Sequence, residues 1–384
     1  MGLQLNPGPG STPGQGLQRS GGLTASVQMS GVHAIALGVA VLVASGCGRP
    51  AEPCEPLVLP AGQPGLPGPL DQEAVVAHLS GERPVGGGHL ENRYDPRSRR
   101  AAAGYVAEVI GSLGLQARAH NYDVRYGDDD QQYCGVNVYA SVPATEGGAG
   151  GHVVVGAHYD SRARGAGDRR NERAGPMPGA NDNATGVALV LSVAEAALRM
   201  PTRSRPLVVV ALDQEEVGLV GARAFADKLR ADGTPVHSVH TVDQVGWDGD
   251  GDRVVEVERP SPMLEALYRS ASDATGVPVR VTDVGSTDHV AFRAAGYEAV
   301  GVTEEFDGGD TTPHYHEPTD TADTVDYDFL ASATRLVWDA VGRALAGADT
   351  TGAQGPGSAG YRRPTPPGGG RRASDGPRAR GARP

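Results

Sequence analysis

Cysteine is scarce in this chain of 384 residues, which contains three: Cys47, Cys54 and Cys134. No CxxC pair is present, so a metal in this protein would be held by histidine and carboxylate side chains. Basic residues are also few, with 34 Lys and Arg against 46 Asp and Glu and a formal net charge of −12. This acidic balance argues against nucleic acid as a partner, because phosphate binding needs a basic surface. Internal repeats are absent from the sequence as well.

The sequence also lacks an apolar run long enough to span a bilayer comfortably. Residues 32–44 form an apolar run of signal-peptide length, followed by Ser45, Gly46 and Cys47. Small residues before a cysteine resemble a bacterial lipoprotein signal, in which the cysteine becomes the lipidated first residue. We therefore predict an exported protein, periplasmic or at the cell surface, with Cys47 as the candidate site of membrane attachment. Met1 and Met29 both stay open as the start of translation.

Composition divides the chain into four parts. We interpret residues 1–47 as the export segment and residues 48–70, rich in Pro and Gly, as a linker. Residues 71–348 form the globular domain. Residues 349–384 are Gly, Pro and Arg with few apolar side chains, so they cannot bury enough surface to order themselves.

The two remaining cysteines are candidates for a disulfide. In an oxidising compartment Cys54 and Cys134 could form one bridge. Since Cys54 lies in the linker, the bridge would tie the start of the mature chain to the domain. The sequence contains no signal that sets an oligomeric state.

Strand and helix patterns alternate within the globular domain. The expected strands are residues 136–142, 152–157, 207–212, 238–242, 253–257, 277–282 and 298–303, and the expected helices are 101–113, 185–200, 219–230, 262–275, 289–295 and 327–345. The run 207–212 is almost continuously apolar, as expected of a central strand covered on both faces. This alternation predicts an α/β fold: a single domain with a central, mostly parallel (mixed) twisted sheet and helices on both faces. Sites in such folds lie at the carboxyl ends of strands.

Clusters of polar side chains follow several predicted strands. These are His158 with Asp160, Asp182, Asp213 with Glu215 and Glu216, Asp243, and a late segment with His314, Tyr315, His316 and Asp320. Two divalent ions need three or four N/O ligands each and a shared hydroxide. Three carboxylates and one hydroxide would balance their charge, so a buried cluster would be near neutral. The set that meets this count is His158, Asp182, Glu216, Asp243 and His316.

Two acidic residues are left over from that ligand count and receive other roles. Glu215 is free to act as a general base, which takes a proton from the metal-bridging water and passes it to the leaving amine. Asp160 is placed to accept the other ring N–H of His158. Asp213 is expected to position its turn.

Five motifs occur in one order along the chain: HxD at His158, GxNDNxxG at Gly179, EExGLxG at Glu215, the DxxG turn at Asp243, and YHxPxDT at Tyr315. Together they resemble the two-zinc aminopeptidase family of bacterial leucyl aminopeptidases, aminopeptidase Y and the glutamate carboxypeptidase branch. The resemblance covers residues 71–346. It implies a zinc-peptidase (phosphorylase/hydrolase-like) fold, two Zn²⁺ ions and hydrolysis of the N-terminal peptide bond of peptides through a metal-bridging hydroxide.

The resemblance also implies a role for each motif residue. His158 and Asp243 bind one zinc, Glu216 and His316 bind the other, Asp182 bridges them, and Glu215 is the general base. Tyr315 matches a tyrosine that stabilises the tetrahedral oxyanion in some members, with side-chain packing as the alternative. The spacing to the Asp-Thr pair selects His316 over His314 as the ligand.

Some residues depart from the family pattern. Ser286 stands where some members have an Arg that engages the substrate terminus, and Gln244 stands where Met or Leu is usual. The loop 161–178 is rich in Arg and follows a metal-binding motif. We expect it to form the rim of the site, where it would favour acidic substrates, or to be a solvated loop.

Three other functions stay open at this point. The first is a dipeptidase or carboxypeptidase, and the second is a glutaminyl-cyclase-like enzyme, which His158 argues against because those relatives lack the His of HxD. The third is a non-catalytic ectodomain, which the complete ligand set and Glu215 argue against.

Overall fold

The computed structural model describes residues 54–59, 69–126, 131–147, 150–162 and 175–348. The predicted export segment, most of the linker and the tail after residue 348 lie outside the described residues, so the boundaries proposed for them stay predictions. Within the described ranges, no helix is both long and apolar enough to cross a membrane.

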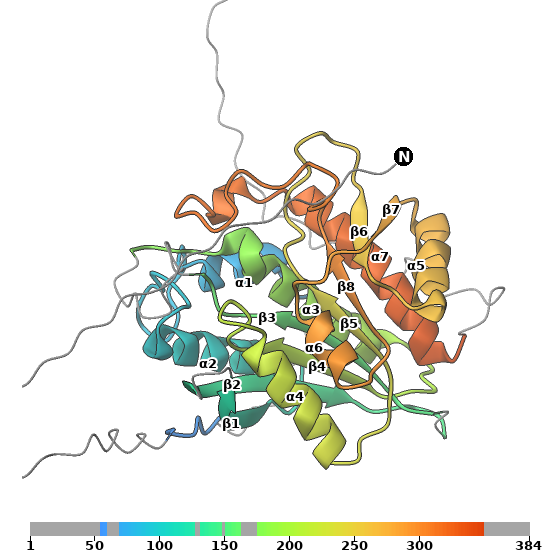
Figure 1. The fold of residues 1–384 in the computed structure, drawn as a ribbon, viewed down its shortest axis with the longest axis horizontal. Helices are drawn as coiled ribbons and strands as arrows, with labels where there is room; N and C mark the ends of the chain where they lie inside the picture. The colour runs from blue at the N-terminus through green and yellow to red at the C-terminus, as the bar shows by residue number, and fades with distance from the viewer. Residues whose placement is uncertain (1–53, 60–68, 127–130, 148–149, 163–174, 349–384) are drawn as a thin grey trace, which may run out of the picture. The chain divides into compact units, whose positions relative to one another are not determined.

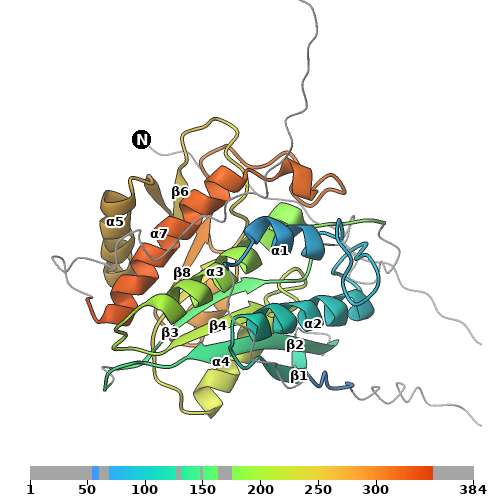
Figure 2. The ribbon, with the colours of Figure 1, turned by 180° about the vertical axis from the view of Figure 1, so that it is seen from behind.

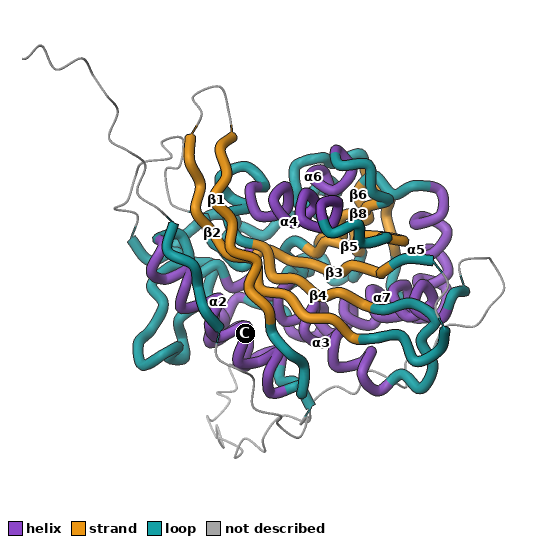
Figure 3. Tube along the Cα trace, turned by 90° about the horizontal axis from the view of Figure 1, so that it is seen from below, coloured by secondary structure: helices purple, strands orange, loops and turns teal. Residues whose placement is uncertain are grey.

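The apolar runs of the sequence pair into one sheet, drawn in orange in Figure 3. Its strands are β1 Arg118–Tyr126, β2 Gln131–Val142, β3 His152–His158, β4 Leu207–Leu212, β5 Val236–Val242, β6 Val255–Glu258, β7 Val279–Thr282 and β8 Ala299–Thr303. Their order across the sheet is β1-β2-β4-β3-β5-β8-β6-β7. The central strands β4, β3, β5 and β8 are parallel, whereas β1, β2 and β6 introduce antiparallel pairs. The predicted mixed sheet with a parallel centre is confirmed.

Helices cover both faces of the sheet, as predicted. They are α1 Gln72–Leu79, α2 Pro96–Ser112, α3 Gly186–Arg199, α4 Val220–Ala231, α5 Pro262–Thr275, α6 His289–Ala294 and α7 Tyr327–Ala346. Figure 1 shows α4 and α6 in front of the sheet, and Figure 2 shows α1, α2, α3 and α7 on the opposite face. Alternate residues of β3 divide between these layers. Val153 and Val155 pack in the larger core with α3 and α7, and Val154 packs in the smaller core with α4 and α6.

The sequence prediction missed helix α1 and strand β1, and it placed the starts of β2, β5 and α2 later than they are observed. Helix α2 starts at Pro96 because Asp95 caps its first turn, accepting hydrogen bonds from the N–H groups of Arg97 and Ser98. Strand β1 has one buried side chain, Tyr122, so it lacks the alternating apolar pattern of a strand and depends on pairing with β2. The short helix α1 was missed as well.

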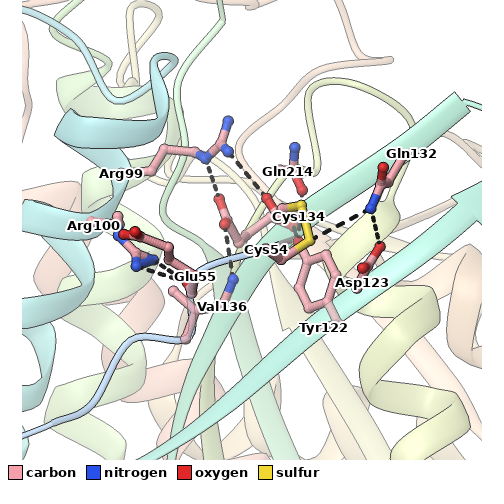
Figure 4. The surroundings of a disulfide bond; sticks show 11 residues. Cys54, Glu55, Arg99, Arg100, Tyr122, Asp123, Gln132, Cys134, Val136 and Gln214 are labelled. Carbon is pink, nitrogen blue, oxygen red and sulfur yellow. Dashed lines mark hydrogen bonds and ion pairs between the residues drawn. A yellow bond between two sulfur atoms is a disulfide. The ribbon is translucent and has the colours of Figure 1, made fainter. Parts of the chain in front are cut away.

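The linker residues 54–59 are attached to the domain. Cys54 and Cys134 form a disulfide with a Cα–Cα distance of 5.5 Å, and Figure 4 shows it beside Tyr122 and Gln132. The backbone N–H of Leu57 also donates to Asn121 Oδ1 of β1. The bridge therefore ties the chain before the domain to the antiparallel edge of the sheet.

Candidate metal centre and active site

The polar clusters meet because their strands are neighbours. His158 is the last residue of β3, which lies between β4 and β5. Glu215 and Glu216 follow β4, and Asp243 follows β5. Since these three strands are parallel, their carboxyl ends meet at one edge of the sheet.

Asp182 lies between two groups of side chains. His158 Nε2 is 3.2 Å from Asp182 Oδ1 and 3.2 Å from Asp243 Oδ1. His316 Nε2 is 3.1 Å from Asp182 Oδ2 and 3.4 Å from Glu216 Oε2. Each oxygen of Asp182 therefore faces a different histidine, as a bridging carboxylate would.

The two groups fit divalent ions. Each offers one imidazole nitrogen and two carboxylate oxygens within 4.8 Å of one another, which is the N/O donor set that zinc takes in proteins. Glu216 Oε1 is buried and has no hydrogen-bond partner among the described residues. A buried carboxylate oxygen without a partner is costly, and a cation would satisfy it.

The electrostatics of the centre also call for positive charge. Burial alone would lower the pKa of His158, but Asp243, Asp160 and Asp182 raise it well above its usual value. Burial likewise opposes protonation of His316, whereas hydrogen bonds with Asp182 and Glu216 raise its pKa to about 9. The carboxylates therefore stabilise any cation between them, either a proton on imidazole or a metal ion.

The turn that carries Asp182 is fixed from two sides. The segment Ala180–Thr185 is a short irregular helix with a cis peptide bond between Asp182 and Asn183. Asn183 Nδ2 donates to the carbonyl oxygen of Val242 at 2.8 Å, which attaches the turn to the end of β5. The carboxylate of Asp320 accepts from the backbone N–H groups of Asn181 and Asp182. The last motif therefore supplies a candidate ligand, His316, and also a support for Asp182.

Asp160 has a wider role than the sequence indicated. Its carboxylate accepts from the backbone N–H groups of Glu215 at 3.0 Å and Glu216 at 3.2 Å. The Nδ1 atom of His158 is 3.2 Å from the carbonyl oxygen of Asp160 and 3.5 Å from its carboxylate. Asp160 thus orients the histidine, mainly through its carbonyl oxygen, and holds the turn that carries the expected base.

A cavity of about 260 Å³ opens onto both groups. It is lined by Arg162, Asp182, Glu215, Glu216, Gly218, Leu219, Asp243, Gln244, Glu258, Ser286, Thr287, Thr303, Phe306, Tyr315 and His316. Burial raises the pKa of Glu215 well above its usual value. The ring of Tyr315 stacks on that of His316 at a centroid distance of 3.7 Å. The expected base and the expected oxyanion donor therefore share one cavity with the candidate ligands.

Other sequence candidates lie outside the two groups. His314 Nδ1 is 3.0 Å from Thr319 Oγ1 and belongs to neither group. Asp213 forms an ion pair with Arg99 at 3.0 Å and accepts from the N–H of Val136. It positions the start of its turn, as expected.

The cavity also contains Glu258, whose place in the site the sequence did not reveal, and Arg162, which belongs to the loop expected at the rim. Glu258, at the end of β6, belongs to no motif, and nothing in its sequence surroundings separates it from Glu256. Arg162 is 3.4 Å from Glu216 Oε2. The rest of the arginine-rich loop, residues 163–174, lies outside the described residues.

The family model and the protein sequences that this chain resembles are those of peptidases. The model of peptidase family M28 matches residues 137–341. A probable leucine aminopeptidase of Trichophyton verrucosum is 28% identical over 284 residues, which cover 70% of this chain and 71% of that protein. Aminopeptidase YwaD of Bacillus subtilis is 28% identical over 199 residues, which cover 50% of this chain and 41% of that protein.

Solved structures share the fold. A zinc aminopeptidase from Bacillus subtilis, BSAP, superposes with a TM-score of 0.58 at 16% identity, covering 71% of this chain and 94% of that one. A glutaminyl cyclase from Bacteroides thetaiotaomicron superposes with a TM-score of 0.54 at 15% identity, covering 71% and 98%. At such identities the likeness shows a common fold and does not by itself choose between the two activities.

Proposed function

The chain belongs to peptidase family M28 and is a zinc-dependent metallopeptidase, and from this premise we propose that it is an exported two-zinc aminopeptidase. It would hydrolyse the N-terminal peptide bond of peptides. The observation that carries the proposal is Asp182, whose two oxygens face His158 and His316 separately. One carboxylate shared by two complete donor groups is the arrangement that two neighbouring ions require.

The ligand assignment follows from the two groups. His158, Asp182 and Asp243 would hold one zinc ion, and Asp182, Glu216 and His316 would hold the other. Bound zinc would polarise the scissile carbonyl group and lower the pKa of a water molecule. The three carboxylates offset most of the charge of two divalent ions, which favours a pair of ions over a single one.

Glu215 is suited to move the proton. Its backbone N–H is held by Asp160, and its partly buried side chain lines the cavity. Burial raises its pKa, and a base works best when its pKa approaches the working pH. Glu215 would take a proton from the attacking water and deliver it to the leaving amine.

Tyr315 is suited to stabilise the oxygen that gains negative charge. Burial raises the pKa of its hydroxyl, so this group stays protonated and can donate a hydrogen bond at neutral pH. Its stacking on His316 limits rotation of the ring. The ring is therefore held beside His316, one of the candidate ligands.

The charge of the cavity supports action at the amino terminus. Glu215 and Asp243 line it, so a free ammonium group is favoured there over a free carboxylate. The complete histidine pair favours a peptidase over a glutaminyl-cyclase-like enzyme. A dipeptidase or carboxypeptidase would be recognised by cleavage of peptides with a blocked amino terminus.

The disulfide supports export. Cys54–Cys134 bridges persist in oxidising compartments such as the periplasm or the cell surface. The export segment and Cys47 lie outside the described residues. Mass spectrometry of the chain from the cell envelope should find a mature chain that begins at lipidated Cys47, and a chain that begins at Met1 or Met29 would contradict this.

The enzymatic proposal is tested by assaying the full chain on aminoacyl p-nitroanilides with and without a chelator. We expect release of p-nitroaniline that the chelator abolishes and added zinc restores, with about two zinc ions per chain by elemental analysis. Release unaffected by the chelator, together with a chain free of zinc, would overturn the proposal. One zinc per fully active chain would overturn its two-ion form.

A further inference from the structure

Glu258 is a buried acidic residue of the cavity that the proposed chemistry does not use. Its exposed fraction is 1%, yet it lines the cavity. It belongs to neither group of candidate ligands. It ends β6, where it pairs with Gly301 of β8. A side chain on Gly301 would collide with the Glu258 carboxylate, at 2.2 Å from Oε2, so the glycine makes room for the acid.

Its contacts leave the carboxylate without a cationic partner among the described residues. Thr287 Oγ1 donates to Glu258 Oε2 at 3.0 Å, and His289 Nδ1 lies 3.3 Å from the same oxygen. Burial, together with Arg293 and Arg259, lowers the pKa of His289 to about 4, so this histidine is neutral at neutral pH. Arg259, the next residue in the chain, instead pairs with Asp283 at 2.8 Å.

We propose that Glu258 is a specificity-determining residue that binds the side-chain cation of a substrate whose N-terminal residue is Lys or Arg. The proposal rests on the aminopeptidase function proposed above. A buried carboxylate held by neutral groups is a poor binding site for an apolar side chain and a good one for ammonium or guanidinium.

The position of Glu258 in the sheet separates it from the reacting bond. Strand β8 lies between β5, which leads to Asp243, and β6. Two strand spacings place Glu258 on the order of 10 Å from β5. The α-amine of the first residue lies one carbon from the carbonyl under attack, so it belongs near the candidate ligands. The terminal charge of a long basic side chain can reach farther.

The rest of the lining suits the stem of such a side chain. Leu219 and Phe306 line the same cavity, and lysine and arginine pack their methylene chains on apolar surface while their charged ends find polar partners. The lining does not favour a substrate whose N-terminal residue is acidic. Arg162 supplies positive charge to the lining, but it already lies 3.4 Å from Glu216 Oε2.

Because Glu258 is buried, the charge of its carboxylate depends on whether a cation lies beside it. Burial, with Asp243 nearby, raises the pKa of Glu258 to about 8. A cation beside it stabilises the ionised form, whereas an uncharged side chain of the same length leaves it unpaired. Sites that bury a polar group for one substrate discriminate strongly against the analogue that lacks the partner.

The test compares lysyl and norleucyl p-nitroanilides, because norleucine lacks only the terminal amine of lysine. With the zinc-loaded full chain we expect kcat/KM at least about tenfold higher for the lysyl substrate. Glu258→Gln keeps an acceptor for Thr287 and should bring the ratio of the two substrates close to one. Glu256→Gln is the matched control. Glu256 lies on the same strand, accepts from the N–H groups of Asp307 and Gly308 and does not line the cavity, so its variant should keep the wild-type ratio.

Three results would overturn the proposal. The wild-type chain could prefer the norleucyl or a glutamyl substrate. Glu258→Gln could lower kcat/KM equally for both substrates, which would assign Glu258 to the α-amine. It could also leave a high lysyl-to-norleucyl ratio unchanged.

Failure of the aminopeptidase proposal is distinguishable from failure of this one. If the chain hydrolyses none of these substrates, calorimetry with lysinamide and norleucinamide still measures the preference of the zinc-loaded wild-type chain. Tighter binding of lysinamide by about tenfold supports the role of Glu258, and equal affinities overturn it. The same measurement serves if Glu258→Gln does not fold.

Discussion

The centre of the sheet and the floor of the cavity are built in different ways. At the centre, His158, Asp182 and Asp243 come from motifs that place ligand and support within a few residues, as in the GxNDNxxG turn. The floor, meaning Glu258 with its neighbours Thr287 and His289, joins the end of β6 to residues at the start of α6, and Glu258 and His289 both lie against Gly301 of β8.

The difference indicates that the centre serves catalysis and that the floor serves the choice among substrates. The centre is held by several hydrogen bonds to backbone groups, so the candidate ligands depend on their neighbours. The side chain of Glu258 accepts one hydrogen bond, from Thr287, within the described part of the chain. We therefore expect changes at the centre to affect every substrate, and changes at the floor to affect the choice among substrates.

Removal of Asp182 should have the largest effect, because both proposed ions share it. Asp182→Ala is expected to lose hydrolysis of all aminoacyl p-nitroanilides and to reduce zinc from about two ions per chain to less than one. Elemental analysis and the assay measure both. Asp273→Ala, an exposed change on α5, should alter neither. An Asp182→Ala chain that keeps two zinc ions would contradict the bridging role.

Glu215→Gln should separate catalysis from metal binding at the same centre. We expect kcat to fall on the order of 10²–10⁴-fold for lysyl and norleucyl substrates alike, with zinc content unchanged, because a base is lost and no ligand is. Glu108→Gln, an exposed change on α2, is the control. Loss of zinc from Glu215→Gln would mean that Glu215 is a ligand.

Tyr315→Phe should lower activity less, and to the same extent for substrates with different side chains. Loss of one donor to the developing oxyanion should lower kcat by about 10²-fold, with a small change in KM. Tyr297→Phe removes a hydroxyl outside the cavity and should change neither constant. A Tyr315→Phe enzyme with wild-type kcat would leave packing on His316 as the role of this ring.

The smallest expected effect is a pH dependence of the preference for lysyl over norleucyl substrates. The pKa of Glu258 is raised to about 8 by burial and by Asp243 and Glu256, against Thr287 and Arg259. His289, which also faces it, is neutral above about pH 4. The carboxylate is therefore protonated below pH 8 and ionised above it, while a lysine side chain keeps its charge to about pH 10.

The lysyl-to-norleucyl ratio of kcat/KM should consequently rise several-fold between pH 6.5 and about 9. Titrations at the metal centre affect both substrates and cancel in the ratio. Glu258→Gln should remove the dependence. A ratio that falls with rising pH in the wild-type chain would contradict an ionised Glu258 as the partner of lysine.

The sequence predicted the secondary structure best where pattern and burial coincide. Strand β4 and helix α5 have the predicted bounds, since β4 is apolar throughout and α5 starts with Ser261 and Pro262. Strand β1 was missed because eight of its nine side chains are at least partly exposed. An edge strand of this kind is stabilised by backbone pairing, which leaves no apolar pattern in its own sequence.

The candidate site was likewise predicted well where a local pattern of residue types exists, and missed where it does not. The motifs named every member of both donor groups, because ligand chemistry restricts residue type and the surrounding turn restricts spacing. They assigned Asp160 to His158 and missed its bonds to the N–H groups of Glu215 and Glu216, since a backbone donor has no residue type to recognise.

What the sequence by itself determined is the fold class and the members of the two donor groups, and it predicted the base, each from local patterns of residue type. Only the tertiary structure decided that Cys54 reaches Cys134 and that Glu258, unlike Glu256, opens into the cavity. The physical reason is that alternation puts Glu256 and Glu258 on the same face of β6, so the strand pattern by itself cannot separate them. The register of β6 against β8 and the space above Gly301 determine which residues Glu258 faces.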